Sequence, residues 1–298
     1  MPYMEKKLNK KLLKKIGYYA LIVFFSLVFI GSAIYLIDYL VRSNQANSEY
    51  SDLQDLYVPP SRPTINSDGT ITYPSDPTDP TGGDTTPEKP TILPELQVFY
   101  DKNPDLVGWI TIPDTKINYP VVQTQNNPDY AKHVADCWYD GWDASDYYLK
   151  HTFSHECSSW GAIYVRPACN VFTPSDNITI YGHHMKDGSM FSGLDGYKKK
   201  PFWESHQYIY FDTLYERHVY QVIAAFKTSA NAGQGYSYHL FDTARTEADF
   251  NKFVSAVKSM AYYDTGISAQ YGDKLITLST CEYSLDEGRH VVVAKRIA

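Results

Sequence analysis

The residues that point to chemistry lie near the C-terminal end of the chain. Cys281 follows an apolar, strand-like run at residues 274–278, and Arg289 begins a second such run eight positions later. A side chain at a strand end is held by the sheet and still reaches solvent, which suits a nucleophile. Because Arg stays charged, two antiparallel strands would place a permanent cation beside an oxyanion formed at Cys281. Most free cysteines are buried hydrophobes, so the pair alone leaves this interpretation open.

A histidine at the end of another strand-like run could complete such a site. His183 follows the run at residues 178–181, with one glycine between them. A thiolate would attack a peptide carbonyl, and an imidazolium would protonate the leaving amine. The thioacyl-enzyme would then wait for a nucleophile. His184 is adjacent, and because neighbouring side chains on a strand point in opposite directions, only one of the two histidines should face Cys281.

The elements that would position these residues predict a mainly β domain over residues 92–298. Short runs of β-type residues separated by turn residues predict a mainly antiparallel closed sheet. These runs cover residues 107–112, 117–122, 161–165, 178–181, 208–211, 219–226, 274–278 and 290–294. A helix is expected over residues 93–102, and a second amphipathic helix begins near Thr246. Residues 133–160 have no clear period and predict a long irregular insertion, with or without a function.

The first 91 residues predict an anchor and a spacer. Residues 1–15 form a basic tail, and a helix over residues 16–41 is long enough to cross the ~30 Å hydrocarbon core of a membrane. The positive-inside rule places the N-terminus in the cytoplasm and the following domain outside. A cleaved signal peptide is the alternative, but its apolar region is usually only ~7–15 residues long. Residues 42–91 are rich in Pro, Ser, Thr and Asp, which predicts an extended extracellular linker.

Charge and cysteine usage narrow the function classes. The formal net charge is −7, and six lysines of the first 15 residues precede the apolar run, so the part after that run is more acidic still. An acidic domain argues against nucleic acid as a partner. If Cys281 is the nucleophile it must stay free, so the other cysteines could form one bridge or stay reduced. Those other three are Cys137, Cys157 and Cys169.

A metal site is a weaker alternative for part of the insertion. His151, His155 and Cys157 have a spacing that could bind a metal ion. No matching fourth ligand is evident, and structural zinc sites normally use four protein ligands. We therefore expect no metal.

Taken together, these motifs resemble the sortases, the cell-wall transpeptidases of Gram-positive bacteria. The run at residues 181–183 (YGH), the run at residues 278–281 (LSTC) and Arg289 look like the signature of that family. Three further runs and one expected helix resemble class B of the family. The runs are residues 103–110 (NPDLVGWI), 118–123 (NYPVVQ) and 147–151 (YYLKH), and the helix covers residues 247–260. The resemblance covers about residues 93–298, and an N-terminal signal-anchor is typical of the family.

The resemblance implies an eight-stranded β-barrel and a role for each matching residue. Cys281 would be the nucleophile, His183 the general acid/base, and Arg289 the stabiliser of the oxyanion or substrate. His184 stands where many relatives have Asn, so it would be a surface or supporting residue. The residues implied for the oxyanion and the substrate groove are Glu282, through its backbone N–H, Ser279 and Thr280. The class needs no metal or cofactor.

The resemblance also implies partners. Sortases cut a sorting signal near the C-terminus of a secreted protein and pass the acyl group to an amine. We expect sorting-signal-bearing secreted proteins as substrates and a peptidoglycan precursor as the amine acceptor, at the cell membrane. A pilin-polymerising sortase that uses a lysine acceptor and a cysteine endopeptidase that uses water are alternatives. A non-catalytic wall-binding module is a third.

Overall fold

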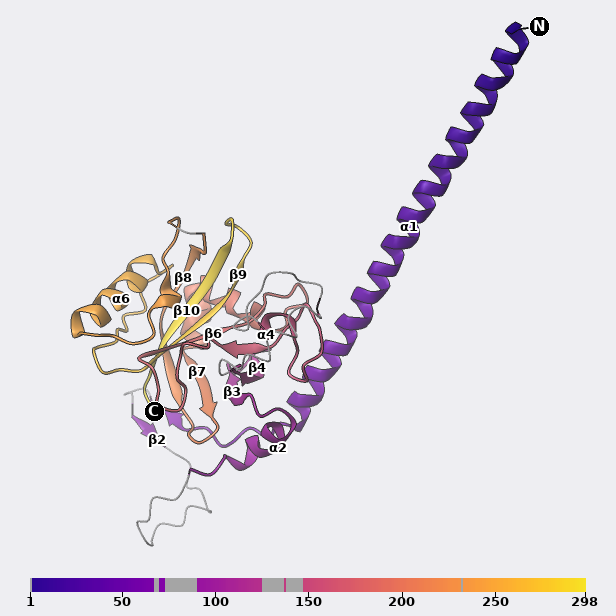
Figure 1. Cartoon of the computed structure of the whole chain (residues 1–298). Coiled ribbons are helices and arrows are strands. Elements are labelled where there is room, and N and C mark those ends of the chain that lie inside the picture. The colour runs from indigo at the N-terminus through magenta and orange to yellow at the C-terminus, as the bar shows by residue number, and fades with distance from the viewer. Residues whose placement is uncertain (1, 67–69, 73–89, 125–136, 138–146, 232) are drawn as a thin grey trace. The chain divides into compact units, whose positions relative to one another are not determined.

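The computed structural model describes residues 2–66, 70–72, 90–124, 137, 147–231 and 233–298 of the chain, with side chains from residue 12 onward. The chain divides into two compact units, Met1–Ser48 and Glu49–Ala298. The first is helical throughout its described residues, and the second holds the β-sheet (Figure 1).

The first helix, α1 (Pro2–Leu56), makes up the first unit, and its last residues, from Glu49 onward, are part of the second. From Leu12 onward it is long and apolar enough to cross a membrane by length and composition. The expected linker over residues 42–91 differs from the structure in its first part, because the helix continues to Leu56. The rest of that linker lies largely outside the described residues.

The last turns of α1 belong to the second unit because they carry an apolar stripe. Tyr50 and Leu53 in the helix and Tyr57 directly after it recur at helical spacing and are all buried. The Tyr50 hydroxyl donates to the backbone oxygen of Gly161 at 2.6 Å. Packing of this kind removes the freedom expected of a spacer, so the second unit begins well before residue 92.

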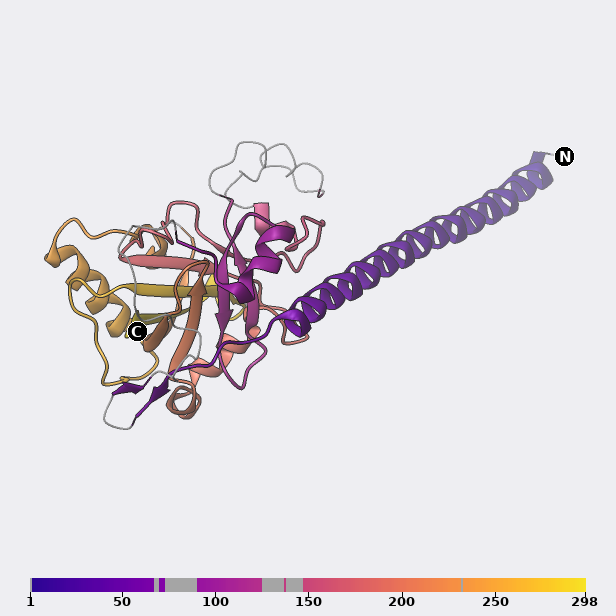
Figure 2. The ribbon, with the colours of Figure 1, turned by 90° about the horizontal axis from the view of Figure 1, so that it is seen from below.

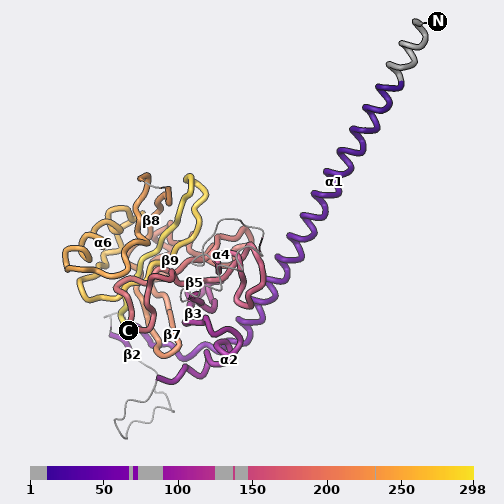
Figure 3. Tube along the Cα trace, in the orientation of Figure 1, coloured from indigo at the N-terminus to yellow at the C-terminus, as the bar shows by residue number. Residues whose placement is uncertain are grey.

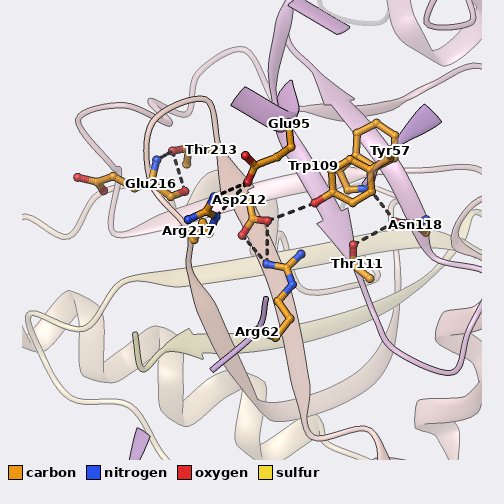
Figure 4. Close-up of polar contacts among 10 residues, drawn as sticks. All are labelled: Tyr57, Arg62, Glu95, Trp109, Thr111, Asn118, Asp212, Thr213, Glu216 and Arg217. Atoms are coloured by element: carbon orange, nitrogen blue, oxygen red, sulfur yellow. Dashed lines mark hydrogen bonds and ion pairs between the residues drawn. The ribbon is translucent and has the colours of Figure 1, made fainter. Parts of the chain in front are cut away.

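The segment after α1 is held by a stacked ring and a buried ion pair (Figure 4). Tyr57 stacks on Trp109 with ring centroids 4.0 Å apart. Nη1 of Arg62 lies 2.7 Å from both carboxylate oxygens of Asp212, whose side chain is fully buried. The guanidinium of Arg62 also lies over the ring of Tyr210, 4.5 Å from the centroid. The chain then forms the small hairpin of β1 (Thr64–Ile65) and β2 (Ile71–Thr72).

Eight strands close into a barrel in the order β10-β8-β7-β3-β4-β5-β6-β9. Their bounds are β3 (Leu106–Thr111), β4 (Asn118–Val122), β5 (Ile163–Val165), β6 (Asn177–Tyr181), β7 (Tyr208–Thr213), β8 (Val219–Ser229), β9 (Leu275–Glu282) and β10 (Gly288–Arg296). The prediction of a mainly antiparallel closed sheet is confirmed. Two pairs are parallel, β4 with β5 and β6 with β9, so the barrel is mixed. The second parallel pair matters because both of its strands end at the same edge.

One amphipathic helix, α6 (Glu247–Met260), covers the sheet beside β8 and β10 (Figures 1 and 2). It begins as the sequence predicts, with the Thr246 hydroxyl accepting the backbone N–H of Asp249 at 3.2 Å. Its buried residues pack against apolar side chains of β8, β9 and β10. Burial of that stripe holds the late strands, which carry the candidate nucleophile, in a rigid layer.

The remaining helices are short. They are α2 (Pro94–Lys102), α4 (Tyr147–Lys150), the 3-10 helix η3 (Phe191–Lys198), α5 (Lys200–Ser205) and the 3-10 turn η4 (Tyr238–Leu240). Asn103, which follows α2, donates from Nδ2 to the Tyr148 hydroxyl at 3.0 Å and to the backbone oxygen of Phe153 at 2.8 Å. The Tyr148 hydroxyl donates to Asp105 at 2.7 Å. These bonds fix the short helix α4, which lies in the expected insertion at 133–160. Most of the earlier part of that insertion lies outside the described residues.

Candidate active site

The hairpin of β9 and β10, traced in yellow in Figure 3, brings Cys281 and Arg289 together. The two residues are direct Cα partners in the antiparallel ladder. Gly288 is paired with Glu282, and a Cβ added there would lie 2.1 Å from the Glu282 backbone oxygen. Only glycine fits that approach, so a small residue at 288 lets the hairpin close next to the thiol.

His183 reaches the same edge from the parallel strand β6. Tyr181 is the Cα partner of Ser279, and the backbone N–H of Gly182 donates to the Ser279 oxygen at 3.2 Å. Two residues beyond this register, His183 and Cys281 emerge from neighbouring strands, whose usual separation is about 4.8 Å. A Cβ at Gly182 would lie 2.5 Å from Ile163, so this step also requires glycine.

The ring of His183 is oriented by a backbone carbonyl. Its Nε2 lies 2.7 Å from the oxygen of Leu149, in α4. Because a carbonyl can only accept, Nε2 carries a proton and donates it, which leaves Nδ1 as the nitrogen that exchanges protons. Burial lowers the pKa of His183; the bond to Leu149 opposes this, and the positive charges of Lys150 and Arg289 lower the pKa further. The neutral imidazole is therefore favoured, and it can accept the proton of a thiol.

The four cysteines have distinct states. Cys281 is a free, partly exposed thiol, and Cys169 is free but buried. Burial is also the main cause that raises the pKa of Cys169. Cys137 and Cys157 form a disulfide, so one bridge, and not three reduced thiols, is the outcome. Of the two free thiols, only Cys281 combines access to solvent with a neighbouring histidine.

Arg289 is the fixed cation of the site. Its Nη1 donates to the backbone oxygen of Gly288 at 2.9 Å, and Nη2 lies 3.5 Å from a carboxylate oxygen of Glu287. The side chain is 30% exposed, so the guanidinium stays accessible to a ligand. The charge of Arg289 lowers the pKa of His183, so the two side chains interact electrostatically.

The neighbours of Cys281 along β9 are more buried than a groove lining would be. Ser279 and Thr280 are 1% and 2% exposed. The Ser279 hydroxyl lies 2.6 Å from the hydroxyl of Tyr238, in η4, and alternation places it on the same face of the sheet as Cys281. Thr280 points to the opposite face. The carboxylate of Glu282 is also buried, and it accepts the backbone N–H of Ser284 at 3.0 Å.

The two adjacent histidines are separated as alternation predicts. His184 places Nε2 3.0 Å from Oδ2 of Asp195, in η3, and its ring meets Tyr283 edge-on at 5.3 Å. It is engaged by these partners, whereas His183 is held by Leu149. The structure therefore favours His183 as the histidine beside the thiol.

Sequence reasoning missed the part that α4 plays. Leu149 acts through its carbonyl, which any residue type supplies, so no residue pattern could reveal it. Lys150, the next residue, interacts electrostatically with both Cys281 and His183. Burial lowers the pKa of Lys150, and the charge of Cys281 opposes that shift. The only available signal was the run at residues 147–151, which resembles class B without a role attached.

The residues that could bind a metal ion in the structure differ from the set that the sequence spacing suggested, which was His151, His155 and Cys157. The ligand atoms of Cys137, His151 and Cys157 lie within 4.8 Å of one another. His155 instead has Nδ1 at 3.3 Å from the Tyr147 hydroxyl. Because both sulfurs are joined in the disulfide, they are not available as the thiolates that bind metal ions.

A nucleophilic thiol, a neutral imidazole and a permanent cation at one edge of a closed barrel define a cysteine acyl-transfer enzyme. A family model described as the sortase domain matches residues 110–297. Sortase B of Staphylococcus aureus is 30% identical over 69% of this chain and 76% of the relative, and sortase B of Listeria monocytogenes is 29% identical over 82% and 88%.

Solved structures agree with these relatives. The Staphylococcus aureus sortase B–substrate complex superposes with a TM-score of 0.58 at 31% identity, covering 70% of this chain and 86% of that one. Sortase B from B. anthracis gives a TM-score of 0.61 at 25% identity, covering 86% and 98%. The chain belongs to the sortase family and is class B-like, a cysteine transpeptidase of cell-wall anchoring.

Proposed function

We propose that this sortase cleaves a C-terminal sorting signal of secreted proteins and transfers the acyl group to an amine of a peptidoglycan precursor. The observation that carries the proposal is the convergence of three strands at one barrel edge. There β6 delivers His183, β9 delivers Cys281, and β10 sets Arg289 directly opposite the thiol. That arrangement suits thioester chemistry on a peptide carbonyl.

In the first half-reaction the thiol of Cys281 gives its proton to Nδ1 of His183. The sulfur attacks the carbonyl of the scissile bond, and the protonated Nδ1 passes its proton to the leaving amine as the C–N bond breaks. In the second half, an acceptor amine attacks the thioester, its proton goes to Nδ1, and the C–S bond breaks. The carbonyl of Leu149 keeps Nε2 protonated throughout, so one nitrogen serves both halves.

The negative oxygen of each tetrahedral intermediate needs donors. We assign this role to the guanidinium of Arg289 and to the backbone N–H of Glu282, which directly follows the nucleophile. Ser279 and Thr280 stay in the proposed substrate-binding set as the residues that shape β9 beside Cys281, since their own side chains are buried. Removing one donor of this kind typically lowers kcat by ~10²–10³.

The proposed location is the outer face of the cell membrane. The apolar helix from Leu12 supports a membrane anchor by its length and composition. The lysines of residues 1–15 precede its apolar run, which begins at about residue 16, and this supports a cytoplasmic N-terminus by the positive-inside rule. The catalytic unit, Glu49–Ala298, would then lie outside, where sorting signals and wall precursors meet.

The test uses the full-length chain in detergent micelles and a quenched fluorescent peptide that carries a sorting signal. Cys281→Ala should abolish cleavage, and the matched variant of the buried free thiol, Cys169→Ala, should retain it. His183→Ala should cause a large loss and His184→Ala a smaller one. Retained cleavage by Cys281→Ala would overturn the nucleophile assignment.

The acceptor is tested by product analysis. Adding an amine that mimics the wall-precursor stem should shift the product from acid to amide. A shift that occurs only with a lysine-bearing pilin domain would identify a pilin-polymerising sortase. Formation of acid alone under all conditions would identify a cysteine endopeptidase.

A further inference from the structure

A closed set of polar contacts lies beside the catalytic strand ends, and the mechanism above does not use it. We call this set the Lys198 ring. Its members are His184, Asp195, Lys198, Glu282 and Tyr283. The ring joins the exit of β6, the helix η3 and the end of β9.

Lys198, the last residue of η3, is the centre of the ring. Its Nζ forms one ion pair with Oε2 of Glu282 and a second, at 2.9 Å, with Oδ1 of Asp195. The Glu282 side chain is only 7% exposed, so its carboxylate depends on partners within the protein.

The other half of the ring returns to β6. Oδ2 of Asp195 lies 3.0 Å from Nε2 of His184. The hydroxyl of Tyr283 donates to the backbone oxygen of His184 at 2.9 Å, which closes the ring. The residues just after Cys281 and just after His183 are thereby linked through η3.

The charges of Glu282, Asp195 and Lys198 are stable around neutral pH. Burial tends to raise the pKa of Glu282, but the bonds from Lys198 and Ser284 outweigh it and lower the pKa to about 2. The pKa of Asp195 is also lowered, by Lys198 and His184 against the effect of burial. The pKa of Lys198 is raised because its two carboxylate partners outweigh its burial. Glu282 and Lys198 therefore remain an ion pair over the range in which the enzyme would work.

The ring bears on catalysis because of strand alternation. Glu282 follows Cys281, so its side chain leaves the opposite face of β9, and anchoring it there fixes where its backbone N–H points. His184 follows His183 and is anchored through the same cation. Lys198 is therefore connected to the residue that follows Cys281 and, through Asp195, to the residue that follows His183.

We propose that Lys198, acting with Asp195, is a positioning residue that holds the backbone N–H of Glu282 and the ring of His183 in register with Cys281. This inference rests on the proposed function of the site. Lys198 does not touch the substrate. Its effect is transmitted through Glu282 and His184, so its removal should weaken transition-state stabilisation more than substrate binding.

The first experiment compares Lys198→Met with Lys198→Arg and Lys200→Met in the full-length protein in micelles. Lys198→Met should lower kcat about tenfold, less than the ~10²–10³ expected when an oxyanion donor is removed, and should change KM less than about twofold. Lys198→Arg, which keeps a cation, should recover most of kcat. Lys200 is exposed and forms no ion pair with the described residues, so Lys200→Met should match the wild type.

Two measurements separate positioning from simple loss of structure. Thermal unfolding followed by circular dichroism gives the folded fraction at the assay temperature, to which kcat is normalised. In a double-mutant cycle, Lys198→Met should reduce kcat clearly less than tenfold when Glu282→Gln is already present, because the path through Glu282 is then broken and only the path through Asp195 and His184 remains.

The proposal is wrong if normalised kcat of Lys198→Met stays within about twofold of the wild type, or if its loss multiplies fully with that of Glu282→Gln. Failure of the proposed function would look different. In that case Cys281→Ala would cleave the sorting-signal peptide as well as the wild type, whatever the result for Lys198.

Discussion

The buried pair between Arg62 and Asp212 gives the sharpest prediction about stability (Figure 4). Arg62 comes from the segment expected to be a spacer, and Asp212 from β7 of the barrel. The Asp212 side chain is 0% exposed and that of Arg62 is 19% exposed. Arg62→Met keeps an apolar stem of similar length and leaves a buried carboxylate without its cation.

The magnitude follows from the burial of the pair. Breaking a buried ion pair by removing one partner costs about 3–5 kcal/mol, and the partial exposure of Arg62 favours the lower end. At about 3 kcal/mol, the melting temperature of a unit of this size should fall by roughly 6–12 °C.

The loss should depend on pH. Burial raises the pKa of Asp212 above its ordinary value of 3.8, and the charge of Arg62 opposes this rise. A raised pKa means that the folded state favours the protonated acid. The contribution of Asp212 to the free energy of unfolding is therefore fully present below pH 3.8 and is lost as pH rises through the folded-state pKa. Without Arg62 the folded-state pKa rises further. The difference between variant and wild type should therefore be large near neutral pH and small at about pH 4.

The assay is thermal unfolding of the full-length protein in micelles at both pH values. Lys258→Met is the matched control, because Lys258 lies 3.9 Å from the carboxylate of Asp264, whose side chain is 80% exposed, and such a pair should contribute less than about 1 kcal/mol. A loss for Arg62→Met that is no larger than the control, or equal at the two pH values, would refute the reasoning.

Three further predictions concern the surroundings of the thiol. Lys150→Met should move the His183 limb of the kcat/KM–pH profile to higher pH, because the charge of Lys150 lowers the pKa of His183. A reductant should lower the melting temperature of the wild type but not of a Cys137→Ser/Cys157→Ser variant, since a bridge spanning 20 residues stabilises by about 3 kcal/mol. Gly182→Ala should lower both kcat and stability, the latter by about 1–3 kcal/mol, because its Cβ has no space.

Each of these predictions has a matched control. Lys186→Met removes an exposed lysine close in sequence to the site and should leave the pH profile in place. Gly193→Ala adds a Cβ whose nearest contact is at 3.4 Å, so a much smaller effect is expected there. An unchanged pH profile for Lys150→Met would contradict the effect of Lys150 on His183. A melting temperature of the wild type that does not change with reductant would contradict the disulfide.

The pairing of Cys281 with Arg289 could be predicted from the sequence because both residues stand at strand ends. Alternation and hairpin pairing depend only on local geometry, so Cys281 and Arg289 were expected to meet, and they are direct partners. The start of α6 at Thr246 was equally local. The contact between His183 and Leu149 could not be predicted in this way, because it joins a side chain to a distant backbone carbonyl.

The spacer shows the opposite case. Composition predicted an extended linker after the apolar helix, and proline and polar residues do favour one. The helical spacing of Tyr50, Leu53 and Tyr57 indicates an apolar stripe but not what covers it, because the partners of Tyr50 and Tyr57 come from far along the chain. The same holds for the Cys137–Cys157 bridge, which sequence spacing left as one of two outcomes.

The sequence by itself indicated the long apolar helix, the closed β-barrel and the candidate site residues, which are one thiol, two adjacent histidines and an arginine, since periodicity and motif spacing encode each of them locally. Tertiary structure decided what holds these groups in place. It favours His183 over His184, because it gives His183 a carbonyl partner from α4 and engages His184 in the Lys198 ring beside the strand ends. The physical reason is that burial and charge pairing depend on residues brought together only when the barrel closes.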